Sequence, residues 1–103
     1  MKPPSSSPVI SSRSELLLSR ARRALRRGER RQALVALREA TLLEQNDAKL
    51  WALYGSACAK SNRLDEAARA FGQALYLRQR ERDVGRATAL RGIIQRLGLN
   101  RAA

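Results

Sequence analysis

Apolar residues recur at three- and four-residue steps along most of the chain, a pattern that predicts an all-α protein of about five helices. The first helix is expected to begin at Ser12, because Ser12 and Glu15 have the spacing of a capping box, and to close at Gly28. A second helix should follow the turn at Gly28 and Glu29 and end near Glu44. Turns this short make the helices that they join antiparallel neighbours.

Polar turns divide the second half of the chain in the same way. Asn46 and Asp47 are expected to cap the end of the second helix and the start of the third helix, which runs to Lys60. The fourth helix should follow a turn at residues 61–63, with Asn62 as its cap.

The last helix is expected at residues 83–97, after a charged joint at residues 79–82. Three small residues recur along it and should allow a neighbouring helix to approach closely. These residues are Gly85, Ala89 and Gly92.

Residues 1–11 contain three prolines and several serines and little that can be buried, so we expect a disordered tail. No long apolar run follows the single lysine of this segment, and no stretch of the chain approaches the length that spans a bilayer. We therefore expect neither a secretory signal nor membrane insertion, and a cytoplasmic location.

A repeat of 34 residues is the strongest signal in the sequence. When the sequence is aligned with itself at an offset of 34 residues, without any gap, residues of the first half pair with residues of similar character in the second half. The pairs are Leu17 and Trp51, Ala21 and Gly55, Ala24 and Cys58, Ala33 and Ala67, Leu37 and Phe71, and Ala40 and Ala74. A helix, a turn and a helix at this period, with small residues where the helices touch, resembles the tetratricopeptide repeat. The same period places Ala89 in register with Gly55 and Ala21.

The resemblance implies an α-solenoid of antiparallel helix-turn-helix repeats over residues 14–97. It would consist of a degenerate repeat at 14–47, a fuller repeat at 48–81 and a capping helix at 83–97. Tyr54 stands where the family pattern has leucine, Cys58 where it has tyrosine, and Gln79 where it has a closing proline. Because about three repeats are usually needed for independent stability, a partner helix or a second copy of the chain is expected to complete the core.

In similar repeats the first helix of each pair lines a groove that binds a peptide or a helix, which implies an adaptor, an assembly factor or a chaperone. Carried over by register, the groove would consist of Leu18, Arg22, Leu25, Arg26, Ala52, Ser56, Ala59, Lys60, Arg86, Leu90, Ile93 and Ile94. An apolar floor with basic flanks suits an acidic or amphipathic segment of a partner protein. On the alternative reading, Leu90, Ile93 and Ile94 form the core of the capping helix and the other positions are ordinary surface.

The chain carries 21 basic and 9 acidic residues, a net charge of +12, which indicates an acidic partner. Arginines gather on the back of the first helix and after it, and we call five of them the arginine patch: Arg20, Arg23, Arg27, Arg30 and Arg31. Clustered guanidinium groups attract phosphate, so the alternative function is sequence-independent binding of RNA or DNA. No series of aromatic residues that could stack on bases accompanies the patch, which favours a protein partner or a solvated face.

The groups that most enzymes use are scarce in this chain. It contains no histidine and a single cysteine, Cys58, and it has no glycine-rich phosphate loop. We therefore expect no enzymatic activity, no catalytic residue, no metal site and no cofactor. Cys58 is expected between the helices of the second repeat as a packing residue rather than as a reactive thiol.

Overall fold

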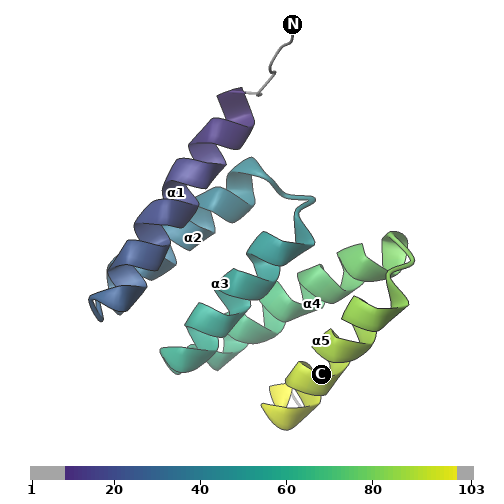
Figure 1. Ribbon diagram of the computed structural model, residues 1–103. Coiled ribbons are helices and arrows are strands. Elements are labelled where there is room, and N and C mark those ends of the chain that lie inside the picture. Colours follow the sequence, from purple (N-terminus) through teal and green to yellow (C-terminus); the bar gives the residue numbers. More distant parts are fainter. Residues whose placement is uncertain (1–8, 100–103) are drawn as a thin grey trace, which may run out of the picture. The chain divides into compact units, whose positions relative to one another are not determined.

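A computed structural model describes the backbone of residues 9–99 and the side chains of residues 13–99. It confirms the predicted all-α fold: five helices and no strand lie within the described range (Figure 1). The helices are α1 (Val9–Arg26), α2 (Arg30–Leu43), α3 (Ala48–Lys60), α4 (Leu64–Arg80) and α5 (Val84–Arg96).

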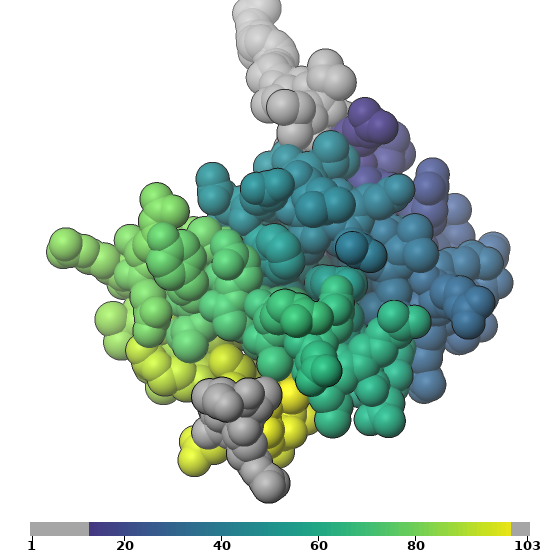
Figure 2. Space-filling model, turned by 180° about the vertical axis from the view of Figure 1, so that it is seen from behind, coloured from purple at the N-terminus to yellow at the C-terminus, as the bar shows by residue number. Residues whose placement is uncertain are grey.

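The helices form two compact units, of which the first ends at Glu44 and the second begins at Gln45. In the first unit, α1 packs antiparallel against α2 (Figure 1). In the second unit, α4 packs against both α3 and α5, and the side chains of α4 and α5 lie side by side in green and yellow in Figure 2. The boundary between the units lies three residues before the expected start of the fuller repeat at residue 48.

The start of the first helix differs from the expectation. Helix α1 begins at Val9, so Ser12 is a residue of the helix and cannot be its N-cap. The predicted capping box is therefore wrong, and residues 9–11 of the expected disordered tail are helical. Residues 1–8 of that tail lie outside the described residues.

Of the three caps predicted at the polar turns, only one is confirmed. Asp47 is the N-cap of α3, and its carboxylate accepts a hydrogen bond from the backbone amide of Leu50 at 3.2 Å. The predictions for Asn46 and Asn62 are wrong, because α2 ends at Glu44 as its C-cap and the N-cap of α4 is Arg63. Asn62 instead adopts a left-handed backbone conformation, with φ +63°, in the turn itself.

The turn between α1 and α2 and the turn between α3 and α4 contain the same hydrogen bond at positions 34 residues apart. Gly28 and Asn62 are equivalent, and both have a positive φ, 76° and 63°. In each turn the next backbone amide donates to the carbonyl five residues earlier. These two bonds, each 2.8 Å long, run from Glu29 N to Ala24 O and from Arg63 N to Cys58 O. The sequence repeat is therefore also a repeat of local structure.

The buried positions of the two hairpins match at the same spacing. Each helix pair meets through small residues with one large side chain between them, so the helix backbones can approach closely. The matched buried pairs are Ala24 and Cys58, Ala33 and Ala67, Ala36 and Ala70, Leu37 and Phe71, and Ala40 and Ala74.

Helix α5 departs from this register. Ala89 is exposed although its expected equivalents Ala21 and Gly55 are buried, and α5 buries Ala87 and Leu90 instead. The reason is that α4 extends to Arg80, three residues beyond the point equivalent to the end of α2, so that α5 begins late. The expected close approach along Gly85, Ala89 and Gly92 is wrong for the described residues, because a Cβ atom at either glycine would meet only atoms of Asp83 or Arg96.

None of the described helices is both long enough and apolar enough to span a bilayer.

The close packing of α3 on α4 predicts opposite effects of alanine at two helical glycines. A Cβ atom at Gly55 would lie 3.1 Å from the ring of Phe71, which is almost fully buried, whereas a Cβ atom at Gly72 would meet nothing within 4 Å. Gly72→Ala should raise the free energy of unfolding by about 1 kcal/mol through helix propensity. Gly55→Ala should lower it by about 1 kcal/mol, because overpacking outweighs the same gain.

Urea unfolding followed by circular dichroism measures both changes. Equal stabilisation at the two sites would contradict the described packing of α3 on α4.

Candidate functional site

A groove lies on the second unit between α3 and α5. We call it the α3–α5 groove, and it has a volume of about 250 Å³. Its lining consists of Lys49, Ala52, Leu53, Ser56, Arg78, Arg86, Ala89, Leu90 and Ile93.

The groove exists because α3 and α5 share one neighbour. Both helices pack against α4, but their own backbones make no close approach to each other. Ala52 and Ser56 on α3 and Ala89 on α5 are small, so their side chains leave the space between the two helices open. The result is a shallow, mostly apolar surface of the kind that accepts the apolar face of a peptide or a helix.

Basic side chains border this apolar surface. The guanidinium group of Arg86 donates to Asp83 Oδ2 at 3.0 Å, and that of Arg78 donates to Glu81 Oε1 at 3.2 Å. The backbone amide of Arg86 donates to Asp83 Oδ1 and, with the guanidinium group, holds the pKa of the Asp83 carboxyl below its usual value. Lys49 forms no ion pair with any described residue. Because a guanidinium group carries five N–H donors, the exposed Arg86 retains donors for a further carboxylate.

The structure brings together five of the residues predicted to bind a partner. Ala52 and Ser56 come from α3, and Arg86, Leu90 and Ile93 come from α5. Leu90 is also buried, so it serves the core of the second unit and the lining of the groove at the same time.

The other predicted residues do not line this groove. Ala59 and Lys60 lie further along α3, and Ile94 lies on α5, outside the lining. The remaining four belong to α1 in the first unit, and they line neither this groove nor the cavity of the first unit that is described below: Leu18, Arg22, Leu25 and Arg26.

Four lining residues were missed by the sequence analysis. Lys49 lies three residues before Ala52, and Leu53 lies three residues before Ser56, so helical spacing alone could have indicated them. Ala89 was noted only as a small residue for helix packing. Arg78 comes from the end of α4, which the short joint to α5 keeps near the groove, but the prediction considered only the first helix of each pair.

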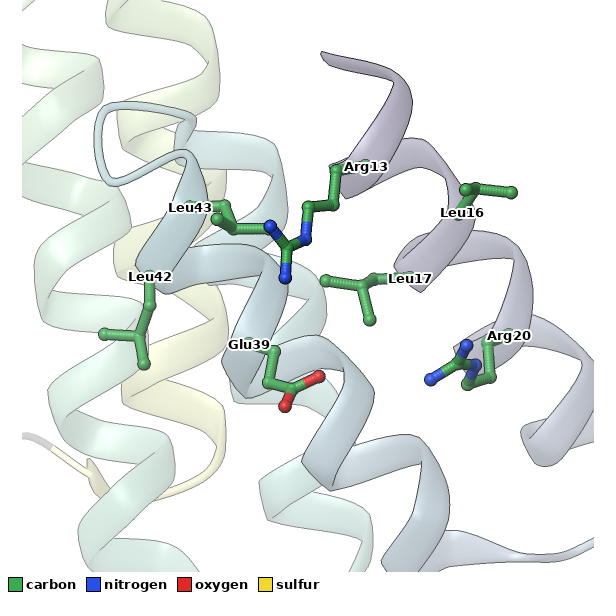
Figure 3. A pocket seen from close by; sticks show the side chains of 7 residues that line it. All are labelled: Arg13, Leu16, Leu17, Arg20, Glu39, Leu42 and Leu43. Carbon is green, nitrogen blue, oxygen red and sulfur yellow. The ribbon is translucent and has the colours of Figure 1, made fainter. Parts of the chain in front are cut away.

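A second cavity lies on the first unit, between α1 and α2, with a volume of about 470 Å³. We call it the α1–α2 hollow, and it is lined by Arg13, Leu16, Leu17, Arg20, Glu39, Leu42 and Leu43. Figure 3 shows Leu17 pointing toward α2, and the guanidinium group of Arg13 extending from α1 toward Leu43 on α2. Arg20 on α1 and Glu39 on α2 face the hollow from opposite sides (Figure 3).

All five arginines of the patch are exposed on the first unit, and none forms an ion pair with a described residue. Arg20 also lines the α1–α2 hollow, so it belongs to a partly apolar surface rather than to a purely basic one. The patch therefore offers unpaired positive charge next to an apolar cavity.

The interior of the second unit contains two titratable groups, Tyr54 and Cys58. The Tyr54 hydroxyl donates to Glu66 Oε2 on α4 at 2.9 Å. Burial raises the pKa of Tyr54, and burial likewise raises the pKa of the Cys58 thiol. Cys58 is fully buried, which confirms its predicted position between the helices, and its raised pKa disfavours the reactive thiolate.

No family model, curated protein or solved structure gives a significant match to this chain. The described residues include no group of three or more histidine, cysteine, aspartate or glutamate side chains placed to hold a metal ion.

The burial of Cys58 predicts that its thiol is protected. In the native protein, 5,5′-dithiobis(2-nitrobenzoic acid) should modify it at least about 100-fold more slowly than in urea, because reaction requires the helices to open at a cost of about 3 kcal/mol or more. The absorbance of the released thionitrobenzoate measures both rates. Equally fast modification in both states would show that the Cys58 thiol is accessible in the folded protein and would contradict its role as a packing residue.

Proposed function

We propose that this chain is a small tetratricopeptide-like interaction module, an adaptor, assembly factor or chaperone, that binds an acidic or amphipathic segment of a partner protein in the α3–α5 groove. The observation that carries the proposal is the groove itself. It gathers residues from the two helices that would supply the binding surface in a repeat of this kind, and its lining has the expected character, apolar with basic borders.

The groove suits a helix or an extended peptide with alternating apolar and acidic positions. Apolar side chains of the partner would bury against Leu53, Leu90 and Ile93, which supplies most of the affinity. Carboxylates of the partner would reach Lys49 and Arg86 at the border, which fixes orientation and accelerates association more than it adds affinity.

Nucleic-acid binding through the arginine patch is the second candidate, favoured by one observation. The five arginines are exposed and have no ion pair among the described residues, so phosphate could reach them. The α3–α5 groove has no place in this function, since its lining holds no aromatic side chain on which a base could stack.

Two lysines of α3 provide a matched test of the groove. Lys49 lines the groove and Lys60 does not, and both are exposed, so Lys49→Glu and Lys60→Glu change the net charge of the same helix equally. Tagged wild-type protein and both variants are incubated with a nuclease-treated extract of the source cells, and the retained proteins are identified by mass spectrometry. The affinity of the segment so identified is then measured by calorimetry.

We expect the wild-type protein and Lys60→Glu to retain the same stoichiometric protein, with Lys49→Glu weakening its affinity about tenfold, or ~1.4 kcal/mol. Equal affinities of Lys49→Glu and Lys60→Glu for the segment would contradict binding in the groove. If material bound from an untreated extract is all removed by nuclease, and reversal of Arg23, Arg27, Arg30 and Arg31 to glutamate also abolishes its binding, the nucleic-acid function replaces the proposed one.

A further inference from the structure

The α1–α2 hollow marks a place where the two repeated hairpins differ. Arg20 is equivalent to Tyr54, but Tyr54 is buried and bonded to Glu66, whereas Arg20 is exposed at the cavity. Leu17 likewise stands where the second hairpin has the larger Trp51. The first hairpin thus lacks the aromatic rings that occupy these positions in the second.

Two of the apolar residues around the hollow are exposed, whereas the second hairpin, on which α5 also packs, buries the equivalents of these two. Leu16 is 68% exposed, whereas its equivalent Leu50 is 5% exposed. Leu43 is also exposed, and its equivalent Leu77 is buried. Identical side chains at equivalent positions therefore differ in burial, so the first hairpin presents an apolar surface that its own unit leaves uncovered.

The charge around the hollow indicates what covers it. Arg13 and Arg20 line it and form no ion pair with any described residue, and Glu39 is its single acidic lining residue. Residues 13–44 contain nine arginines and four glutamates. An occupant that buries the leucines must therefore also present carboxylates to the two arginines.

We propose that the α1–α2 hollow is a second docking site, which binds an acidic amphipathic helix of a partner protein. A large apolar or aromatic side chain of that helix enters the hollow over Leu17 and Leu42, and carboxylates on its flanks accept hydrogen bonds from Arg13 and Arg20. The site lies on the first unit and does not depend on binding in the α3–α5 groove.

Two other occupants fit the same surface less well. A second copy of this chain would bring a net charge of +12 against the exposed arginines, so the two copies repel each other. A nucleic acid would leave the three exposed leucines of the lining unburied and would place phosphates near the carboxylate of Glu39. An acidic helix satisfies both the apolar and the basic part of the lining.

The probe is a fluorescein-labelled synthetic helix of about 16 residues, or four to five turns. It carries one tryptophan and two leucines on one face and glutamates on both flanks. Its binding to the full chain is measured by fluorescence anisotropy at low salt. Leu42 and Val35 form a matched pair on α2, with exposures of 57% and 56%, but only Leu42 lines the hollow. We expect Leu42→Asp to weaken binding at least tenfold and Val35→Asp to change it less than twofold.

A second variant fills the hollow instead of charging it. Leu17→Trp with Arg20→Tyr introduces the residues of the second hairpin at equivalent positions, so the melting temperature should not fall while binding of the probe is lost. Retained binding by this variant would overturn the proposal, as would equal effects of Leu42→Asp and Val35→Asp. A dimer that is seen in sedimentation and that Leu42→Asp dissociates would assign the hollow to a second copy of the chain. An RNA oligonucleotide that displaces the probe, and whose own affinity Leu42→Asp lowers, would assign the hollow to nucleic acid.

Discussion

The architecture of the second unit depends on the contact between Gly55 of α3 and the ring of Phe71 on α4. A Cβ atom at this point would lie 3.1 Å from the ring, so even alanine would force the almost fully buried ring to shift. The contact brings α3 close to α4 along a face that also buries Tyr54 and Cys58. Helix α4 packs against α5 as well, so α3 and α5 lie on either side of a gap. The small residues of α3 that face this gap, Ala52 and Ser56, therefore line a groove and do not form part of the core.

Acidic residues are few, and several of them serve local structure. Asp47 and Asp83 cap α3 and α5, and Glu66 accepts the hydroxyl of Tyr54. Glu66 and Asp83 also form ion pairs with Arg69, Arg78 and Arg86, but these pairs all lie in the second unit. The excess positive charge is therefore distributed over exposed side chains without ion pairs, above all in the first unit, where Arg13 and Arg20 border an apolar cavity.

The features that the sequence predicted correctly are set by local spacing, although three other local predictions, the caps at Ser12, Asn46 and Asn62, were wrong. The turn at Gly28, the cap at Asp47 and the buried face shared by the two hairpins all follow from a few neighbouring residues and the 34-residue period. Features that depend on helix length were missed. The extension of α4 to Arg80 changed which face of α5 is buried. The α1–α2 hollow lies where Leu17 and Arg20 replace the larger Trp51 and the buried Tyr54, a difference in side-chain size that the repeat register contains but that was not used to predict a cavity.

The two oxygens of Asp83 have separate partners, which bears on how the groove responds to an acid. Oδ1 accepts the backbone amide of Arg86 and begins α5, whereas Oδ2 accepts the guanidinium group of the same residue. An incoming carboxylate competes only for the second bond. The guanidinium group of Arg86 can therefore leave the Asp83 carboxylate for a carboxylate of the partner while the N-cap hydrogen bond of α5 remains. The border of the groove can rearrange in this way without unfolding the first turn of α5.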